Sequence, residues 1–143
     1  MNRARTAAGC AIVLASAGSA GATATLTCAI DDPSAKLELL ASVGTPASSP
    51  IGSVRGSVTL KPAPGRPSVK VDVTRENLAQ QWIDGPALRL WLSVTGSDAT
   101  PDMDLVIVAR RVADTDFRGR YRLTGRRGPA TRSAAGRVAC TLG

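Results

Sequence analysis

Apolar and polar residues alternate along most of the chain with a period of two. In residues 36–43 (KLELLASV) the apolar side chains fall on one side, and the same alternation recurs in residues 51–61, 68–74 and 87–95. Antiparallel strands with one face on a core and the other in water show this pattern. We therefore predict four half-buried strands in these segments.

Three further segments follow the alternation less regularly. Residues 24–30 and 131–142 place Cys28 and Cys140 on their apolar faces, so both segments are predicted to be strands with an inward-facing cysteine. Residues 103–112 are apolar on both faces around their middle, which is expected of a more central strand.

The segments between these strands are short and rich in glycine, proline and aspartate, as turns are. The one helical candidate is the segment near residues 75–81 (RENLAQQ), for which Thr74 is a suitable N-cap. Together with the arginine-rich segment 116–124 described below, about eight strands result. We predict an all-β fold, either an antiparallel meander barrel or a two-sheet β-sandwich, with one short helix.

The first 22 residues have the organisation of a secretory signal peptide. A basic head is followed by the apolar residues 7–17 and then by small residues, so cleavage after Ala20 or Ala22 is expected. The apolar run is well short of the about 20 residues that cross a bilayer, and no later run is long enough to do so. We expect a secreted or periplasmic protein whose residues 23–143 form a single β domain.

Cysteine usage agrees with export. Cys10 leaves with the leader, whereas Cys28 and Cys140 lie near the two ends of the remaining chain. In an oxidising compartment such a pair predicts one disulfide, and two separate thiols are the alternative. A loop of this length stabilises the fold by at most about 4–5 kcal/mol in the chain-entropy model.

Positive charge is concentrated in the last third of the chain. The formal net charge is +7, and residues 105–143 hold nine arginines and two aspartates, whereas residues 23–104 hold seven basic and nine acidic residues. Every basic residue of the last third is arginine, whose planar guanidinium suits paired contacts with carboxylate or phosphate.

Residues 116–127 (DFRGRYRLTGRR) carry three arginines at alternate positions, with Phe117 and Tyr121 between them on the opposite face. More arginines follow at the next turn and on the strand after it, and Asp72 or Glu38 on other strands could neutralise part of their charge. The alternation predicts an anion-binding face formed by Arg118, Arg120, Arg122, Arg126, Arg127, Arg132 and Arg137.

Several kinds of catalytic site are excluded by composition. The chain has no histidine, which removes serine and cysteine triads and the usual zinc sites, and two cysteines cannot form an all-cysteine zinc site. No glycine-rich nucleotide motif is present, and we expect no cofactor and no metal. Asp98, Asp102 and Asp104 are expected to lie in a solvated turn, with a calcium site or a carboxylate-based hydrolase as the alternatives.

The two tryptophans allow two interpretations. Trp91 falls on the polar face of its strand beside Arg89, where it could be an exposed platform for a sugar or a base. The preferred interpretation is that the helical segment, or another loop, covers it, with Trp82 as the covering residue.

These features predict a non-enzymatic binding protein for an anionic component of the cell envelope. Candidate partners are an anionic polysaccharide, a lipid head group or an acidic protein. Nucleic acid is disfavoured, because Phe117 and Tyr121 point away from the arginines and cannot stack bases beside them. The alternative is a structural or inhibitory envelope protein whose basic face is only a solvated surface.

Overall fold

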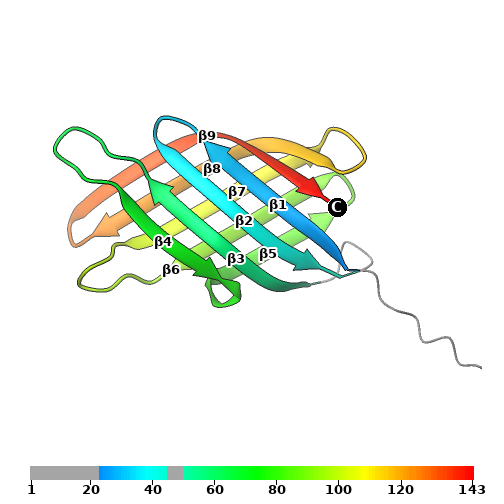
Figure 1. Ribbon diagram of the computed structural model, residues 1–143, viewed down its shortest axis with the longest axis horizontal. Helices are drawn as coiled ribbons and strands as arrows, with labels where there is room; N and C mark the ends of the chain where they lie inside the picture. The colour runs from blue at the N-terminus through cyan, green and yellow to red at the C-terminus, as the bar shows by residue number, and fades with distance from the viewer. Residues whose placement is uncertain (1–22, 45–49) are drawn as a thin grey trace, which may run out of the picture.

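The computed structural model describes residues 23–44 and 50–143, and the predicted signal peptide in residues 1–22 lies outside them. The described chain forms nine antiparallel strands and one short 3-10 helix (Figure 1). They are β1 (Ala24–Asp31), β2 (Ala35–Val43), β3 (Ile51–Leu60), β4 (Val69–Thr74), η1 (Arg75–Asn77), β5 (Leu78–Asp84), β6 (Ala87–Val94), β7 (Asp102–Arg111), β8 (Asp116–Arg127) and β9 (Ala130–Leu142).

All nine strands belong to one sheet in the order β4-β3-β2-β1-β9-β8-β7-β6-β5. Neighbours in this order are neighbours along the chain, except that β1 pairs with β9 at the centre of the sheet. The sheet curls until its two edges approach each other, as the tilted strands in Figure 1 show. The all-β prediction is confirmed, and of its two architectures the nearly closed meander barrel is the one observed.

The barrel closes where one stretch of chain changes partners. β4 pairs with β3, the chain bends at η1, and β5 then pairs with β6. Side chains tie the first residue of β3 across this seam. The amide of Ile51 donates to Gln81 Oε1 at 2.8 Å, and Arg75 Nε donates to the carbonyl of Ile51 at 2.9 Å. Polar side chains thus help to join the two edges of the sheet.

The prediction of a helix near residues 75–81 is wrong beyond its first turn. Only Arg75–Asn77 form a helical turn, in which Asn77 Oδ1 accepts from the amide of Thr74 at 2.8 Å. The rest is strand β5, whose register shifts between Leu78 and Gln80. This bulge breaks the period of two, which is why the residues do not look like a strand in the sequence.

The inward-facing residues of the strands form one apolar core. Leu88, Leu90 and Leu92 are buried on β6, and Phe117 and Tyr121 are buried on β8, all on the sides that the alternation predicted. None of the fully buried residues in the described part of the chain is charged or polar, apart from the tyrosine hydroxyl. The core is therefore packed by apolar side chains, and the arginines of β8 must project outward.

Cys28 and Cys140 are directly opposite each other on β1 and β9 and form a disulfide with an S–S distance of 2.07 Å. Both cysteines are buried. The predicted disulfide and its inward orientation are confirmed. The bond covalently links the first and last strands at the centre of the sheet.

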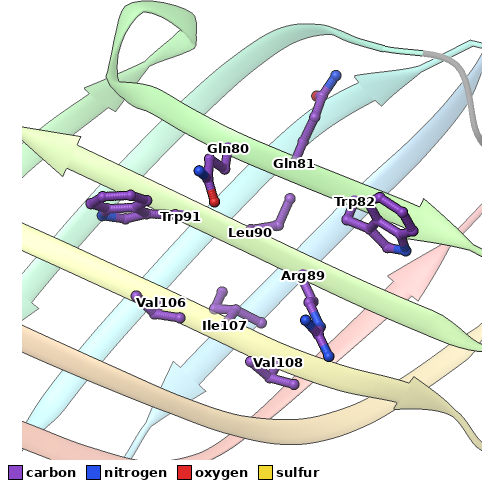
Figure 2. A pocket seen from close by; sticks show the side chains of 9 residues that line it. All are labelled: Gln80, Gln81, Trp82, Arg89, Leu90, Trp91, Val106, Ile107 and Val108. Atoms are coloured by element: carbon purple, nitrogen blue, oxygen red, sulfur yellow. The ribbon is translucent and has the colours of Figure 1, made fainter.

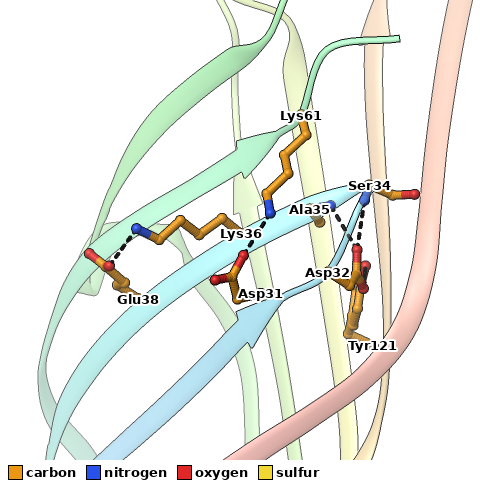
Figure 3. A network of polar contacts seen from close by, with 8 residues as sticks. All are labelled: Asp31, Asp32, Ser34, Ala35, Lys36, Glu38, Lys61 and Tyr121. Carbon is orange, nitrogen blue, oxygen red and sulfur yellow. Dashed lines mark hydrogen bonds and ion pairs between the residues drawn. The ribbon is translucent and has the colours of Figure 1, made fainter.

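A polar cluster lies at the turn between β1 and β2 (Figure 3). Asp32 Oδ1 accepts from the amides of Ser34 and Ala35 at 2.8 and 2.9 Å, and Asp32 Oδ2 accepts from the Tyr121 hydroxyl at 2.5 Å. Gly136 lies opposite Tyr121, and a Cβ there would stand 2.5 Å from Asp32 Oδ2. The bare backbone at Gly136 makes room for this bond.

Candidate functional site

Exposed arginines gather on the outer wall of the barrel, over four neighbouring strands. β8 contributes three of them at alternate positions, and β6, β7 and β9 contribute one each on the same face. We call this surface the arginine wall; it consists of Arg89, Arg110, Arg118, Arg120, Arg122 and Arg137.

Two pairs of these arginines face each other across neighbouring strands. Arg110 is directly opposite Arg118, and Arg120 is directly opposite Arg137. Side chains in such positions have their Cβ atoms about 5 Å apart, and like charges placed there destabilise a sheet. The two arginine pairs therefore lower the stability of the fold unless another interaction compensates for the repulsion.

Acidic side chains do not relieve this repulsion. Within the described ranges, no carboxylate oxygen lies within 4.0 Å of a guanidinium nitrogen of the arginine wall. Glu38 instead pairs with Lys36 at 2.9 Å, and Asp72 lies opposite Ser57 at the β3–β4 edge of the sheet. The suggestion that Glu38 or Asp72 could neutralise the arginines is therefore not realised in this structure.

The structure divides the seven predicted anion-binding residues into two groups. Arg118, Arg120, Arg122 and Arg137 lie together on the arginine wall. The other three lie at the end of the barrel and bind the protein itself, as follows: Arg126 pairs with Asp104 at 2.7 Å, Arg127 donates to the Asp98 carbonyl at 2.8 Å, and Arg132 donates to the Pro67 carbonyl at 3.1 Å.

Both tryptophans lie on the outer surface beside the arginine wall. Trp82 on β5 is 58% exposed and Trp91 on β6 is 39% exposed. The expectation that Trp82 and the helical segment cover Trp91 is therefore wrong. Trp82 lies on β5, and η1 ends before this strand begins, so neither covers Trp91 and both indoles keep a solvent-exposed surface.

The outer residues of the apolar run in β7 are also exposed. Its inner residues are buried, but Val106 and Val108 are 39% and 47% exposed. Val106 lies between Trp91 and Arg122, and Val108 lies between Arg89 and Arg120. The inner residues of the run face the core, whereas its outer valines form an exposed apolar patch with the two tryptophans. We call Trp82, Trp91, Val106 and Val108 the tryptophan patch.

The tryptophan patch and the arginine wall form one continuous surface. One row across the sheet reads Trp82, Arg89, Val108, Arg120 and Arg137, with one residue from each of the strands β5 to β9. A shallow open depression of about 570 Å³ lies over β5, β6 and β7 (Figure 2). Aromatic, aliphatic and cationic groups are thus within reach of a single ligand.

Of the three aspartates expected in a solvated turn, only Asp98 lies in the β6–β7 loop, whereas Asp102 and Asp104 belong to strand β7 and make polar contacts. Asp104 accepts from Trp91 Nε1 at 3.3 Å and pairs with Arg126, so it links the tryptophan patch to the end of β8. Asp102 Oδ1 accepts from the amide of Gly96 at 2.7 Å. Throughout residues 23–44 and 50–143, no group of three potential metal-ligating side chains is present. Asp104 thus holds Trp91 and Arg126, and Asp102 holds the backbone of the β6–β7 loop at Gly96.

Sequence reasoning missed Arg110 and the connection between the tryptophans and the arginines. The register between β7 and β8 could have been predicted from the turn at Asp114. Residues equally far from this turn face each other on β7 and β8, which pairs Val108 with Arg120 and Arg110 with Arg118. Trp82 could not be placed in this way, because the bulge in β5 hides its strand.

Comparison with protein families, with curated proteins and with solved structures finds no match to this chain. In the described part, no helix is long and apolar enough to cross a membrane. The function must therefore be inferred from the surface chemistry of the barrel.

Proposed function

We propose that this protein is a non-enzymatic binding module that holds an anionic component of the cell envelope on its arginine wall. The two like-charged pairs, Arg110 with Arg118 and Arg120 with Arg137, carry the proposal. A face that is only solvated gains nothing from placing arginines opposite each other, whereas an anion that lies across β7, β8 and β9 would relieve the repulsion between them.

The chemistry of the wall supports an anionic partner. Guanidinium groups bind carboxylate, sulfate and phosphate oxygens through paired hydrogen bonds, and they stay charged at all physiological pH values. The Arg120 and Arg122 guanidiniums make no hydrogen bond or ion pair within the described residues, so their donors are available. Binding through these groups should depend strongly on salt and little on pH.

Placement outside the cytosol is part of the same proposal. A disulfide such as Cys28–Cys140 is typical of oxidising compartments, and the leader expected in residues 1–22 would deliver the chain there. In such a compartment the partner would be a polyanion of the cell envelope.

Retention on immobilised heparin tests the proposal. The variant Arg118→Ala/Arg120→Ala/Arg122→Ala should elute at much lower salt than the parent protein. The matched control is Lys36→Ala/Lys61→Ala/Lys70→Ala, which removes the same amount of charge from the opposite half of the sheet. The control should elute close to the parent. Equal losses in both variants, or no retention of the parent, would show that the basic face is only a solvated surface.

A further inference from the structure

The tryptophan patch adds a second kind of chemistry to the arginine wall. Trp82 and Trp91 are the only tryptophans of the chain, and both are exposed on the same face of the barrel. Trp82 is opposite Arg89, and Trp91 is the next outward residue on β6, about 7–8 Å from Trp82 across the strands. Figure 2 shows the two indoles at opposite ends of the depression, so they provide two separate aromatic faces on one surface.

Polar groups lie between these aromatic rings. Arg89 stands between Trp82 and Val108 in one row, and Gln80 is opposite Trp91 in the next (Figure 2). Trp91 Nε1 donates to Asp104, which orients that indole on the wall. The surface therefore alternates apolar faces with hydrogen-bonding groups at intervals of about 5 Å. A complementary ligand has flat apolar faces, a polar rim and negative charge.

An anionic glycan has all three properties. Sugar rings present carbon-bound hydrogens on their faces, hydroxyl groups at their rims, and carboxylate or sulfate groups when they are acidic. We propose that the envelope component is an anionic glycan whose sugar rings stack on Trp82 and Trp91 while its acidic groups contact Arg89, Arg120 and Arg122. This proposal rests on the proposed function and specifies its ligand.

Two other polyanions are less favoured as the partner. A lipid bilayer favours an apolar face that can enter the interface by about 5–10 Å, whereas here the polar residues Arg89 and Gln80 lie between Trp82 and Trp91. Single-stranded nucleic acid also binds through stacking and arginine, and the exposed Trp82 and Trp91 supply the stacking groups that Phe117 and Tyr121 do not. The Cys28–Cys140 disulfide favours a compartment in which envelope glycans are the abundant polyanions.

Tryptophan fluorescence tests the glycan proposal directly, because all of the tryptophan emission comes from the patch. Trp82→Phe and Trp91→Phe each leave one tryptophan, so each variant reports one position. A heparin oligosaccharide should change the emission of both variants, and neutral dextran should leave both unchanged. Trp82→Ala should weaken oligosaccharide binding about tenfold. The control is Leu40→Ala, since Leu40 on β2 is another exposed large hydrophobic residue, at 39%, but lies outside the tryptophan patch and the arginine wall.

The outcomes separate this proposal from the proposed function. Heparin retention that depends on the arginines, with silent tryptophans and an unchanged affinity of Trp82→Ala, would overturn the glycan stacking and leave the anion-binding function standing. A stronger emission change with phosphatidylglycerol vesicles, or with a single-stranded oligonucleotide, would overturn the glycan in favour of that partner. An absence of both retention and emission change would overturn both proposals.

Discussion

The Tyr121 hydroxyl donates a hydrogen bond to Asp32 Oδ2 at 2.5 Å, although the two residues are 89 positions apart in the sequence. Tyr121 is buried in the core on β8, and Asp32 belongs to the turn after β1. The bond therefore ties the β1–β2 turn to strand β8 (Figure 3).

The variant Tyr121→Phe should lower the free energy of unfolding by about 1.5–3 kcal/mol. The substitution keeps the buried ring and removes one hydrogen bond to a charged acceptor, and bonds of that kind contribute about this much. Urea unfolding followed by circular dichroism measures the change. The arginine wall lies on the opposite face of β8, so heparin retention should stay unchanged in this variant. An unaltered unfolding midpoint would show that the bond adds nothing to stability.

Stability should fall at both extremes of pH because of the same pair. Burial raises the pKa of Asp32, but hydrogen bonds from Tyr121 and from the amides of Ser34 and Ala35 outweigh this and lower it below its ordinary value of 3.8. Burial and the bond to Asp32 raise the pKa of Tyr121 above its ordinary value of 10.0.

The direction of each change in stability follows from the protonation state that the folded protein favours. Folding favours the charged form of Asp32, so its contribution is present above pH 3.8 and is lost as the pH falls through the lowered pKa. Folding favours neutral Tyr121, so its contribution is complete below pH 10.0 and is lost as the pH rises further. Urea midpoints measured across pH should show both declines. The alkaline decline should be weaker in Tyr121→Phe, and an identical alkaline decline in the variant would contradict this assignment.

Reduction of the Cys28–Cys140 disulfide should be slow in the native protein and should strongly destabilise it. Both sulfurs are buried, so a reductant reaches them only after the sheet opens. The bond closes a loop with a sequence separation of 112, for which about 4–5 kcal/mol is the upper limit of the stabilisation. Thiol labelling during incubation with dithiothreitol, with and without urea, measures the access. Rapid labelling without urea would show that the sheet opens locally around β1 and β9.

Neutralising one arginine of the wall should increase stability. Arg120→Gln removes the charge opposite Arg137 and should raise the free energy of unfolding by about 0.5 kcal/mol at low ionic strength. The gain should disappear at high salt, where exposed charges are screened. Lys70→Gln is the matched control, because Lys70 faces Thr59 rather than another cation. A loss of stability in Arg120→Gln at low salt would show that the repulsion is negligible.

Most of the barrel could be predicted from alternation, because each strand has one dry face. The same rule placed Arg118, Arg120 and Arg122 outside and Phe117 and Tyr121 inside. The pairing of Cys28 with Cys140 followed from their positions near the two ends and on apolar faces. These predictions succeed because they depend on local pattern and on burial, which the sequence shows directly.

The functional surface was harder to predict because it depends on register across several strands. The tryptophan patch needs Trp82 beside Arg89, and the bulge between Leu78 and Gln80 hides the strand that carries Trp82. Val106 and Val108 are apolar, so the sequence does not distinguish them from core residues. They are exposed because the strands form a single curved sheet whose outer face is uncovered there.

The seam of the barrel lies midway along the chain, whereas the two ends of the described chain lie side by side at the centre of the sheet. The amide of Thr25 donates to the carbonyl of Gly143 at 2.6 Å, and η1 joins the two strands at the edges. A circular permutant that starts within η1 and links Gly143 to the start of β1 would therefore keep every pair of adjacent strands. In that connectivity the chain would run from one edge of the sheet to the other without interruption.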